Sequence, residues 1–419
     1  MGNGAGGAAI TGLVEDWCVD GLQRGAPWMV DDDPLSDLTV IIPTWSRQDY
    51  VLRQFLFWST SAVRLIVVDG SDTPLTDRVR SMVSDHPRFT YLHDPRSFAE
   101  RLRYVGENLS TKYAVMLGDD EFHLPSGLRS AIRILDYEED LVGCMGQVLS
   151  FSPLDGYRRC LFSRAYPGMA NFSVRHEEPN ERVLAAMDPY TMATCYAVLR
   201  TPVWQQSWGS VGGYSSGVAA EMQQAIAVHL LGPFRSHDAV QWLRSVENSI
   251  NPVSDLESER GRMLWFPEWW ESDDFQAEHQ EFLERITTAV AENSPCTPAE
   301  CRGIVSAGAC LFAERHGAAF KSLDQIGGVE RWRHLPLTRL ALSVAGRLPD
   351  GVGLALRRFR SLLHRRSGAQ GDGYLGVVEE LPRRLQAVGL ESTVEFLAEV
   401  ALVEQLVAEF HSLRGERPT

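Results

Sequence analysis

Three adjacent carboxylates, Asp119, Asp120 and Glu121, follow the short apolar run YAVML after a single glycine. Like charges this close repel one another, and removing even one of them from water is costly unless a cation or strong donors compensate it. Hard cations such as Mg²⁺ and Mn²⁺ bind carboxylate oxygens and keep coordination sites open for substrate phosphates. The triplet therefore predicts a metal–diphosphate site, in which the cation would act as a Lewis acid.

The segment before the triplet alternates between apolar, β-rich runs and amphipathic stretches. The runs predict strands buried on both faces, and the stretches predict helices. Ser46 and Ser97 are the expected N-caps of the first and third helices. The expected strands are 38–44, 64–72, 88–94 and 113–121, and the expected helices are 46–59, 74–86 and 97–109. This alternation implies right-handed βαβ units and a parallel sheet.

Polar residues gather where the expected strands end. Thr44 is the last residue of the first expected strand, Asp69 and Asp72 lie at the end of the second, and the triplet lies at the end of the fourth. Ligands of parallel α/β sheets bind outside the carboxyl ends of the strands, so we expect these side chains along one edge. Helix caps and turns explain Ser46 and Asp72 well, but a single cap would suffice where three carboxylates stand.

After the triplet the pattern of apolar residues is less regular, and toward the end of the sequence it becomes that of helices. Residues 219–232 predict a helix that ends at Gly232, and 239–246 predict a last strand. From about residue 267 onward the apolar positions repeat with a helical period. We therefore expect an α/β fold, with a mostly parallel Rossmann-like sheet and helices on both faces, followed by an all-helical domain. The expected boundaries are a flexible arm at 1–36, the α/β domain at 37–268 and the helical domain at 269–419.

Composition narrows the partners and the compartment. The formal net charge is −15 over 419 residues, which argues against a nucleic-acid partner because phosphate neutralisation needs a basic surface. Seven scattered cysteines without CxxC pairs favour reduced thiols in a cytoplasmic enzyme. No stretch approaches the roughly 20 apolar residues of a membrane span, and no signal-peptide pattern opens the chain.

The segments LTVIIPTWSRQDYV, LIVVDGSD and YAVMLGDDEFHLPSGL together resemble the family 2 nucleotide-sugar glycosyltransferases, which have the GT-A fold. In that family P-T-[YFW]-[NS]-R follows the first strand, V-D-x-S follows the second, and an acidic D-x-D motif ends the fourth. The run FAERLRYVGENLSTKYAVMLGDDEF is particularly similar to a bacterial subgroup from surface-polysaccharide and natural-product gene clusters. The resemblance covers about residues 38 to 250. It implies transfer of a sugar from a nucleotide-diphosphate sugar, with a UDP-sugar favoured.

The resemblance also implies roles for individual residues. Pro43, Thr44 and Arg47 would line the nucleotide pocket, Asp69 would contact the base, and Arg101 would lie near the base or diphosphate. Asp119 would contact the ribose, while Asp120 and Glu121 would face Mn²⁺ or Mg²⁺. This chain ends its triplet in Glu where the family has Asp, and the longer side chain would shift the ion.

Inverting transfer needs a general base that deprotonates the acceptor hydroxyl. Family members place an Asp or Glu for this at a helix start, about a hundred residues after the acidic motif. Glu221 in GVAAEMQQAI matches that position, although an acid in a first helical turn also complements the helix dipole. Asp188 is the second candidate. Arg244 resembles a terminal-strand arginine of the subgroup, and His237 is either a third metal ligand or, more simply, a surface-loop histidine.

Two further segments bear on the acceptor, which could be a glycan, a lipid-linked molecule or a small molecule. The aromatic cluster at 265–270 could stack against a sugar, but aromatic residues more often build cores. The arginine-rich segment 331–366 could contact an anionic membrane at its inner face, or it could be a solvated basic face. The helical domain is where we would expect self-association.

Other classes of protein remain as alternatives. Residues 213–217, GYSSG, match the G-x-S-x-G motif of serine hydrolases, but no buried strand is expected before them. A sugar-1-phosphate nucleotidyltransferase would need a Gly-rich basic loop where PTWSRQ stands. A degenerate transferase that binds a nucleotide sugar without turnover would lack the base or the metal ligands, and both candidate sets are present.

Overall fold

The structure is a computed structural model that describes residues 4–24, 33–154, 156–248, 263–333 and 373–414. At its centre lies a mixed sheet, which has 11 strands in the described part of the chain. Four of them run parallel in the order β3-β2-β1-β4. Their bounds are Leu38–Thr44 for β1, Arg64–Asp69 for β2, Phe89–His93 for β3 and Tyr113–Met116 for β4. All four expected strands are therefore confirmed.

Three helices connect these strands, as predicted. They are α2 at Gln48–Trp58, α3 at Asp77–Asp85 and α4 at Phe98–Glu107. Ser97 caps α4 in a reciprocal capping box with Glu100. The expected cap at Ser46 is wrong, because Ser46 has a φ of 56° and Arg47 takes the cap position. The Ser46 amide instead donates to the Ser71 hydroxyl at 2.9 Å, which ties the loop after β1 to the loop after β2.

The second half of the sheet joins the first through β9, which pairs with both β4 and β6. The predicted last strand is confirmed as part of β10, and β10 pairs in parallel with β6 and antiparallel with the short β5. The bounds are Phe122–His123 for β5, Gly143–Leu154 for β6, Arg159–Ala165 for β7, Ser173–Val174 for β8, Val198–Arg200 for β9 and Phe234–Ser245 for β10. The β5 pairing brings the end of β10 beside the acidic triplet.

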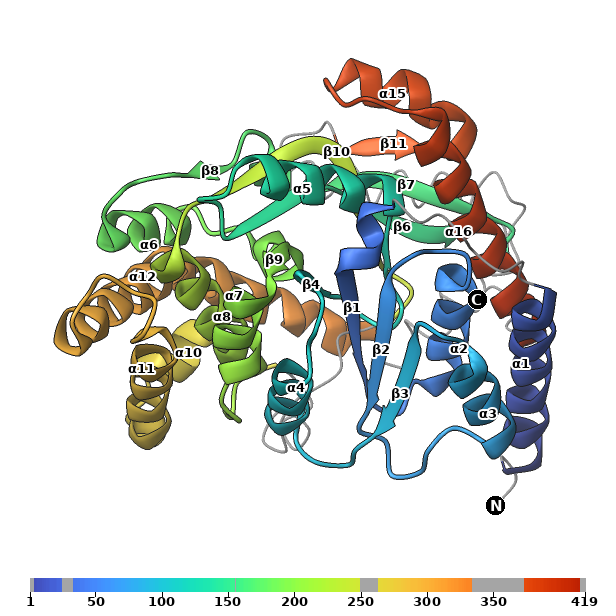
Figure 1. Cartoon of the computed structure of the whole chain (residues 1–419), viewed down its shortest axis with the longest axis horizontal. Helices are drawn as coiled ribbons and strands as arrows, with labels where there is room; N and C mark the ends of the chain where they lie inside the picture. Colours follow the sequence, from blue (N-terminus) through green and yellow to red (C-terminus); the bar gives the residue numbers. More distant parts are fainter. Residues whose placement is uncertain (1–3, 25–32, 155, 249–262, 334–372, 415–419) are drawn as a thin grey trace.

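Helices cover both faces of the sheet (Figure 1). The additional ones are α5 at Pro125–Tyr137, α6 at Pro179–Met187, α7 at Thr201–Gln206 and α8 at Gly217–Leu231. Short 3₁₀ turns, η1 to η4, lie at Pro34–Asp37, Pro167–Met169, Met192–Tyr196 and Trp208–Ser210. Helix α8 is the one predicted to end at Gly232, and it does.

The C-terminal region is helical, as expected, and it splits into two parts. One part packs against α6 and α8, and the other returns to the sheet through β11, which pairs with β7, and through α16, which contacts α2 and α5. The first part consists of α10 at Phe266–Glu271, η5 at Asp273–Phe275, α11 at Gln276–Val290 and α12 at Pro298–Arg333. The second part consists of β11 at Tyr374–Gly376, η6 at Val378–Glu380, α15 at Leu381–Ala387 and α16 at Val394–Leu413.

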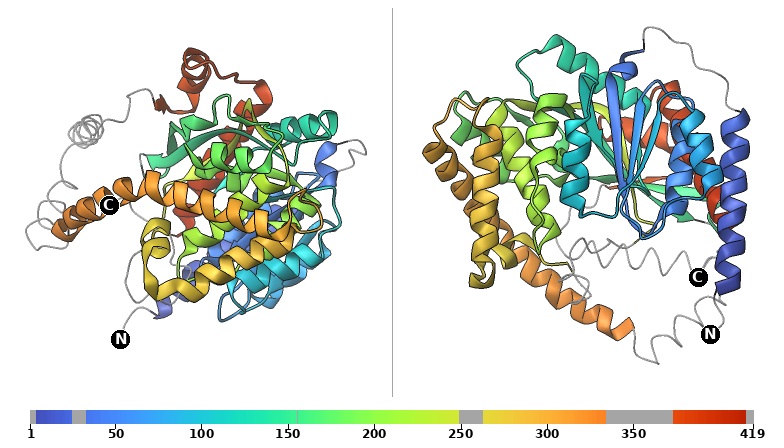
Figure 2. Two further views of the ribbon diagram at one scale, coloured as in Figure 1. Left: turned by 90° about the vertical axis from the view of Figure 1, so that its left-hand side faces the viewer. Right: turned by 60° about the horizontal axis from the view of Figure 1, so that its bottom comes forward.

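The N-terminal segment, where we expected a flexible arm, contains helix α1 at Gly4–Arg24. Val14 and Cys18 on this helix are fully buried, and α1 packs against α2 and α3. Figure 2 shows α1 and α11 on opposite sides of the sheet. One hydrophobic cluster includes residues of α1, the sheet, α11 and α16, and the expected domain boundaries stay predictions.

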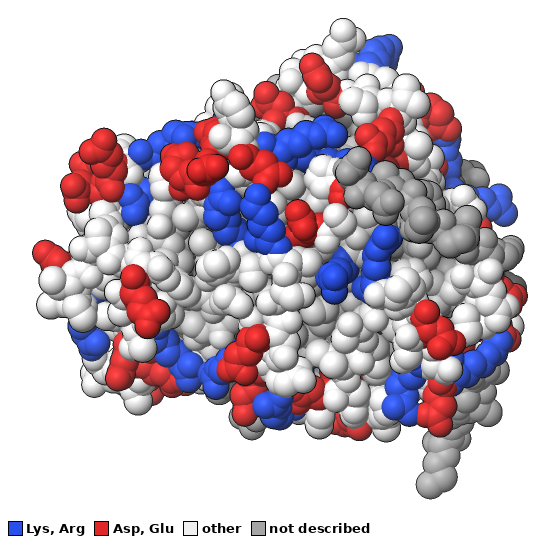
Figure 3. Space-filling view, in the orientation of Figure 1, with Lys and Arg blue, Asp and Glu red and all other residues white. Residues whose placement is uncertain are grey.

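Two features bear on the expected surroundings of the protein. No helix in the described ranges is long and apolar enough to cross a membrane. On the face shown in Figure 3, acidic and basic side chains are interspersed over the described residues. Most of the arginine-rich segment proposed for membrane contact, 334–366, lies outside the described residues.

Candidate functional site

A cavity of about 380 Å³ opens beyond the carboxyl ends of β1 and β4. This is the edge of the sheet where ligands of parallel α/β folds bind. The cavity is lined by residues from several elements, and the predicted site residues among them are Pro43, Arg47, Asp120, Glu121, Glu221 and Arg244. The structure thus brings these six residues, from distant segments of the chain, around one cavity.

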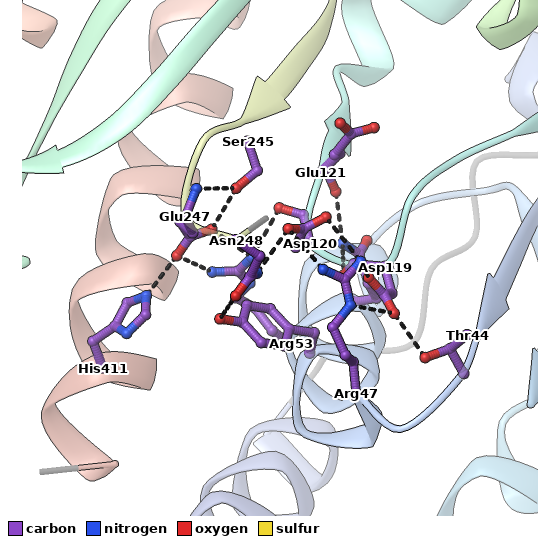
Figure 4. A network of polar contacts seen from close by, with 12 residues as sticks. Thr44, Arg47, Arg53, Asp119, Asp120, Glu121, Ser245, Glu247, Asn248 and His411 are labelled. Atoms are coloured by element: carbon purple, nitrogen blue, oxygen red, sulfur yellow. Dashed lines mark hydrogen bonds and ion pairs between the residues drawn. The ribbon is translucent and has the colours of Figure 1, made fainter. Parts of the chain in front are cut away.

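The acidic triplet lies in a turn whose side chains are almost removed from solvent. Asp119, Asp120 and Glu121 are 3, 8 and 9% exposed. Arg47 pairs with the carboxylates of both Asp119 and Asp120, and its Nη1 lies 3.3 Å from Asp120 Oδ2. The Thr44 hydroxyl donates to Asp119 Oδ2 at 2.7 Å. In this structure the guanidinium of Arg47 is thus one cation that compensates the buried carboxylates (Figure 4).

Two buried polar residues of α2 form hydrogen bonds with the backbone of the same turn. Gln54 Nε2 donates to the carbonyls of Asp119 at 3.0 Å and Glu121 at 2.6 Å. Arg53 Nη2 donates to the carbonyl of Asp120 at 2.9 Å. Because a buried carbonyl without a partner is costly, these bonds let three polar peptide groups lie inside the fold. The sequence contains one indication of these bonds, which is the polar pair Arg53 and Gln54 inside the otherwise apolar stretch YVLRQFLFW.

Arg53 belongs to a further network that sequence reasoning missed. Its guanidinium makes a bidentate pair with Glu247, at 3.0 and 2.9 Å, and His411 of α16 contacts the same carboxylate (Figure 4). Burial would raise the pKa of Glu247, but the charge of Arg53 and the hydrogen bond with His411 outweigh it and lower the pKa to about 2. Next to it, Asn248 donates to Asp120 Oδ2 at 2.8 Å. The C-terminal helix therefore contacts the residues that support the triplet.

The carboxylates of the triplet differ in their surroundings. Burial raises the pKa of Asp119 to about 6, although Arg47 opposes the shift. Burial and the nearby Asp120 raise the pKa of Glu121 well above its ordinary value, and Arg244 opposes that shift. Trp242 donates its indole N–H to Glu121 Oε2 at 3.1 Å. Figure 4 shows the Glu121 carboxylate directed away from Arg47. Glu121 is therefore a buried acid that would gain from an added cation.

Four of the predicted nucleotide contacts, Thr44, Asp69, Arg101 and Asp119, are not part of the cavity lining. Asp69 is fully buried and accepts hydrogen bonds from the Ser71 amide at 2.9 Å and the Tyr91 hydroxyl at 2.6 Å. Arg101 Nη1 donates to the carbonyls of Thr44 and Val68, both at 2.9 Å, and so ties the ends of β1 and β2 together. Their predicted contacts with a nucleotide stay predictions.

Glu221 lies on α8 and lines the cavity. The Tyr190 hydroxyl donates to Glu221 Oε1 at 2.7 Å. Burial raises the pKa of Glu221 to about 7, and the hydrogen bond from Tyr190 opposes the shift. Asp188, the second candidate base, ends α6 and pairs with Arg315 at 2.9 Å, and it lines neither this cavity nor a second one beside it. The geometry therefore favours Glu221 as the carboxylate that could exchange a proton with a ligand.

The remaining candidates fall outside the cavity lining. His237 is 7% exposed in the irregular part of β10, where its Nε2 lies 3.3 Å from Gln241, so its placement on a surface loop is wrong. Ser215 of the G-x-S-x-G match donates its hydroxyl to Glu278 at 2.6 Å. A 3₁₀ turn and loop precede it where a nucleophile elbow needs a strand.

The residues present fit a cation that is shared with a substrate. Within the described ranges no three His, Cys, Asp or Glu side chains form a group that could hold a metal ion. Asp120 and Glu121 both line the cavity, however, and two carboxylates are typical of Mg²⁺ sites that take their other ligands from phosphates and water. We therefore assign these two residues as the candidate ligands.

Comparisons with known proteins find matches among solved structures. No protein-family model and no curated protein matches the chain. Among solved structures, S. aureus TarS residues 1–349 is similar at 12% identity and a TM-score of 0.43, over 67% of this chain and 72% of that one. The same protein in complex with UDP-GlcNAc gives 14% and 0.43 over the same shares. Its complex with UDP gives 10% and 0.41 over 90% of each chain. At these low values the site itself remains the basis for a functional assignment.

Proposed function

We propose that this protein is a metal-dependent glycosyltransferase, which moves a sugar from a nucleotide-diphosphate sugar, with a UDP-sugar favoured, to an acceptor hydroxyl with inversion. One observation carries the proposal. A single cavity at the carboxyl edge of the sheet contains both a pair of carboxylates suited to a cation, Asp120 and Glu121, and a separate carboxylate from α8, Glu221. Such a transfer needs these two functions on opposite sides of the anomeric carbon.

On the donor side, Asp120 and Glu121 would hold Mn²⁺ or Mg²⁺ together with the diphosphate. The cation would supply Lewis-acid stabilisation of the leaving group when bound. Arg47 and Arg244 also line the cavity, and guanidinium groups bind phosphate oxygens through charge-assisted hydrogen bonds. In this proposal Arg47 exchanges carboxylate oxygens for phosphate oxygens when the donor enters.

On the acceptor side, Glu221 would take the proton of the acceptor hydroxyl as its oxygen attacks the anomeric carbon. One C–O bond forms to the acceptor, the bond to the diphosphate breaks, and the proton goes to Glu221. The Tyr190 hydroxyl orients this carboxylate. A base with a pKa near 7 is well matched to neutral pH, because it is deprotonated in part and still a good proton acceptor.

The first test is isothermal titration of the protein with UDP, GDP and dTDP, each with Mn²⁺ and with EDTA. Metal-dependent binding of one nucleotide, which Asp120→Ala abolishes and the exposed-site control Asp77→Ala retains, supports the donor site and identifies the nucleotide. If no nucleotide binds under either condition, the proposal is wrong.

The second test separates catalysis from binding. Glu221→Gln should retain nucleotide binding and lose turnover of the donor, whereas the exposed control Glu284→Gln should retain both. For the unmodified protein, kcat/KM should rise with pH through about 7, because only the deprotonated Glu221 can act as the base. A protein that binds the nucleotide but shows no turnover at any pH would be the degenerate binding protein considered above.

A further inference from the structure

A second cavity, of about 350 Å³, lies beside the first. The two cavities share two lining residues, Val218 and Glu221, which are one turn apart on α8. The Glu221 carboxylate therefore lies at the boundary between the cavity with the acidic triplet and the second one. A ligand in either cavity could reach it.

The lining of the second cavity is dominated by aromatic and other apolar side chains. Tyr190 meets Phe312 edge to face, with ring centroids 5.3 Å apart at 84°. Tyr166 stacks on Trp242 at 5.7 Å and 8°, and Trp265 and Met192 also line the space. Ring faces and edges of this kind bind flat apolar groups through dispersion and offset stacking.

Polar partners are few in this lining. The Tyr190 hydroxyl already donates to Glu221, and the other polar groups besides that carboxylate belong to Tyr166, Thr191, His316 and the indole of Trp265. A glycan would bring many hydroxyl groups, each of which must find a partner when it leaves water. An apolar ring system that carries one hydroxyl needs only one partner, and Glu221 supplies it. The volume also lies within the usual range of small-molecule sites.

We propose that the second cavity is the acceptor site and that its ligand is a small alcohol or phenol carried on an apolar ring system. This inference rests on the proposed glycosyltransferase function. The ring would occupy the space between Tyr166, Phe312 and Trp265, and its hydroxyl would point across the shared boundary toward Glu221. The anomeric carbon of the donor would approach from the first cavity. Of the three acceptor classes expected from the sequence, a glycan, a lipid-linked molecule and a small molecule, this inference selects the small molecule.

The experiment measures the binding of three ligands to the same protein. 2-Naphthol is the probe for the second cavity, cellobiose is the glycan comparison, and UDP with Mn²⁺ reports on the first cavity. We expect saturable binding of 2-naphthol, its conversion to a glycoside with the donor whose nucleotide binds, and neither result with cellobiose. Met192→Trp should fill the second cavity and weaken 2-naphthol binding by about tenfold or more, while UDP binding changes by less than about twofold.

Met82→Trp on α3 is the matched control, because Met82 is also half-buried and α3 lies on the other side of the sheet. It should leave both ligands unaffected. Phe312→Leu keeps the site apolar but removes the ring that meets Tyr190, and it should weaken 2-naphthol binding by about threefold to tenfold. A thermal unfolding curve for each variant shows whether it is folded.

The outcomes separate the two proposals. If UDP binds but 2-naphthol does not, or if Met192→Trp leaves 2-naphthol binding unchanged, the acceptor inference is overturned and the glycosyltransferase proposal stands. Glycosylation of cellobiose in place of 2-naphthol overturns it as well. If 2-naphthol binds but no nucleotide does, both the acceptor role and the proposed function are overturned.

Discussion

Arg47 and Arg53 both form hydrogen bonds with the acidic turn after β4, but Arg47 lines the cavity and Arg53 is buried. The Arg47 side chain is 22% exposed, lines the cavity and pairs with the carboxylates of Asp119 and Asp120. The Arg53 side chain is fully buried and bonds Glu247 and the backbone of Asp120. The first can therefore exchange partners with an incoming ligand, whereas the second cannot move without leaving a buried charge unpaired. An arginine can therefore form a contact that a ligand replaces, as at Arg47, or a permanent structural contact, as at Arg53.

The largest expected effect comes from the residue that both arginines contact. Asp120→Asn should lower metal-dependent turnover by about 10³-fold, because a cation site worth several kcal/mol of transition-state stabilisation loses a ligand. The free energy of unfolding should change by less than about 1 kcal/mol, since Arg53 bonds the backbone of residue 120 and not its side chain. Steady-state kinetics with Mn²⁺ and urea unfolding check the two parts. Unchanged turnover would remove Asp120 from the site.

The next effect is the loss of the buried pair. Arg53→Met should lower the free energy of unfolding by about 3–5 kcal/mol, because it leaves the Glu247 carboxylate buried without its partner. The double variant Arg53→Met/Glu247→Met should recover part of this loss, since neither charge then remains. Urea unfolding of the single and double variants provides the measurement. A loss below about 1 kcal/mol for Arg53→Met would mean that the two arginines do not differ as described.

The same pair predicts a pH dependence of slightly smaller size. The pKa of Glu247 is lowered to about 2 from an ordinary value of 4.5, which corresponds to about 3 kcal/mol of stability. This stability is fully present above about pH 4.5 and is lost as the pH falls toward 2, because the unfolded state takes up the proton first. The difference in stability between the unmodified protein and Arg53→Met should therefore shrink over this range. A difference that stays constant down to pH 2.5 would contradict the assignment.

The last comparison is the loss of Arg47, which should affect stability less than the loss of Arg53. Arg47→Met should lower the free energy of unfolding by about 1–2 kcal/mol, because Arg47 is 22% exposed and Asp119 and Asp120 keep their hydrogen bonds from Thr44 and Asn248. Affinity for the metal-bound nucleotide should fall by about tenfold, which is the usual size for one charge-assisted contact. Titration calorimetry beside urea unfolding gives both values. A larger loss of stability than for Arg53→Met would reverse the comparison.

The sequence was sufficient for features that depend on near neighbours. Strands β1 to β4 and helices α2 to α4 follow from apolar runs and helical periodicity, and the capping box of α4 joins residues three apart. The parallel pairing of these strands follows from the βαβ alternation. The location of the triplet at the carboxyl edge of the sheet was predictable for the same reason.

Features that depend on distant contacts were not predictable in this way. Ser46 looked like a helix cap, but its amide bonds Ser71, 25 residues away. Asp69 accepts a hydrogen bond from Tyr91 of β3, and Arg101 donates to the carbonyls of Thr44 and Val68; neither partner was predicted. Helix α16, which lies in the expected helical domain, packs against α2 and α5, and this contact was not predicted either. In each case the sequence indicated the residue or helix, but it did not indicate the distant residues that it contacts.

The sequence by itself determined that a parallel sheet ends in three adjacent carboxylates, because apolar periodicity and a local motif need no long-range contact. Only the tertiary structure decided what surrounds them. Arg53 meets Glu247 across 194 residues, and Glu247 meets His411 across 164. Glu221 lies at the boundary of two cavities on α8, which packs against α6 and α11. Burial and charge at such sites arise from packing between distant segments, and packing sets the pKa values on which the proposed chemistry depends.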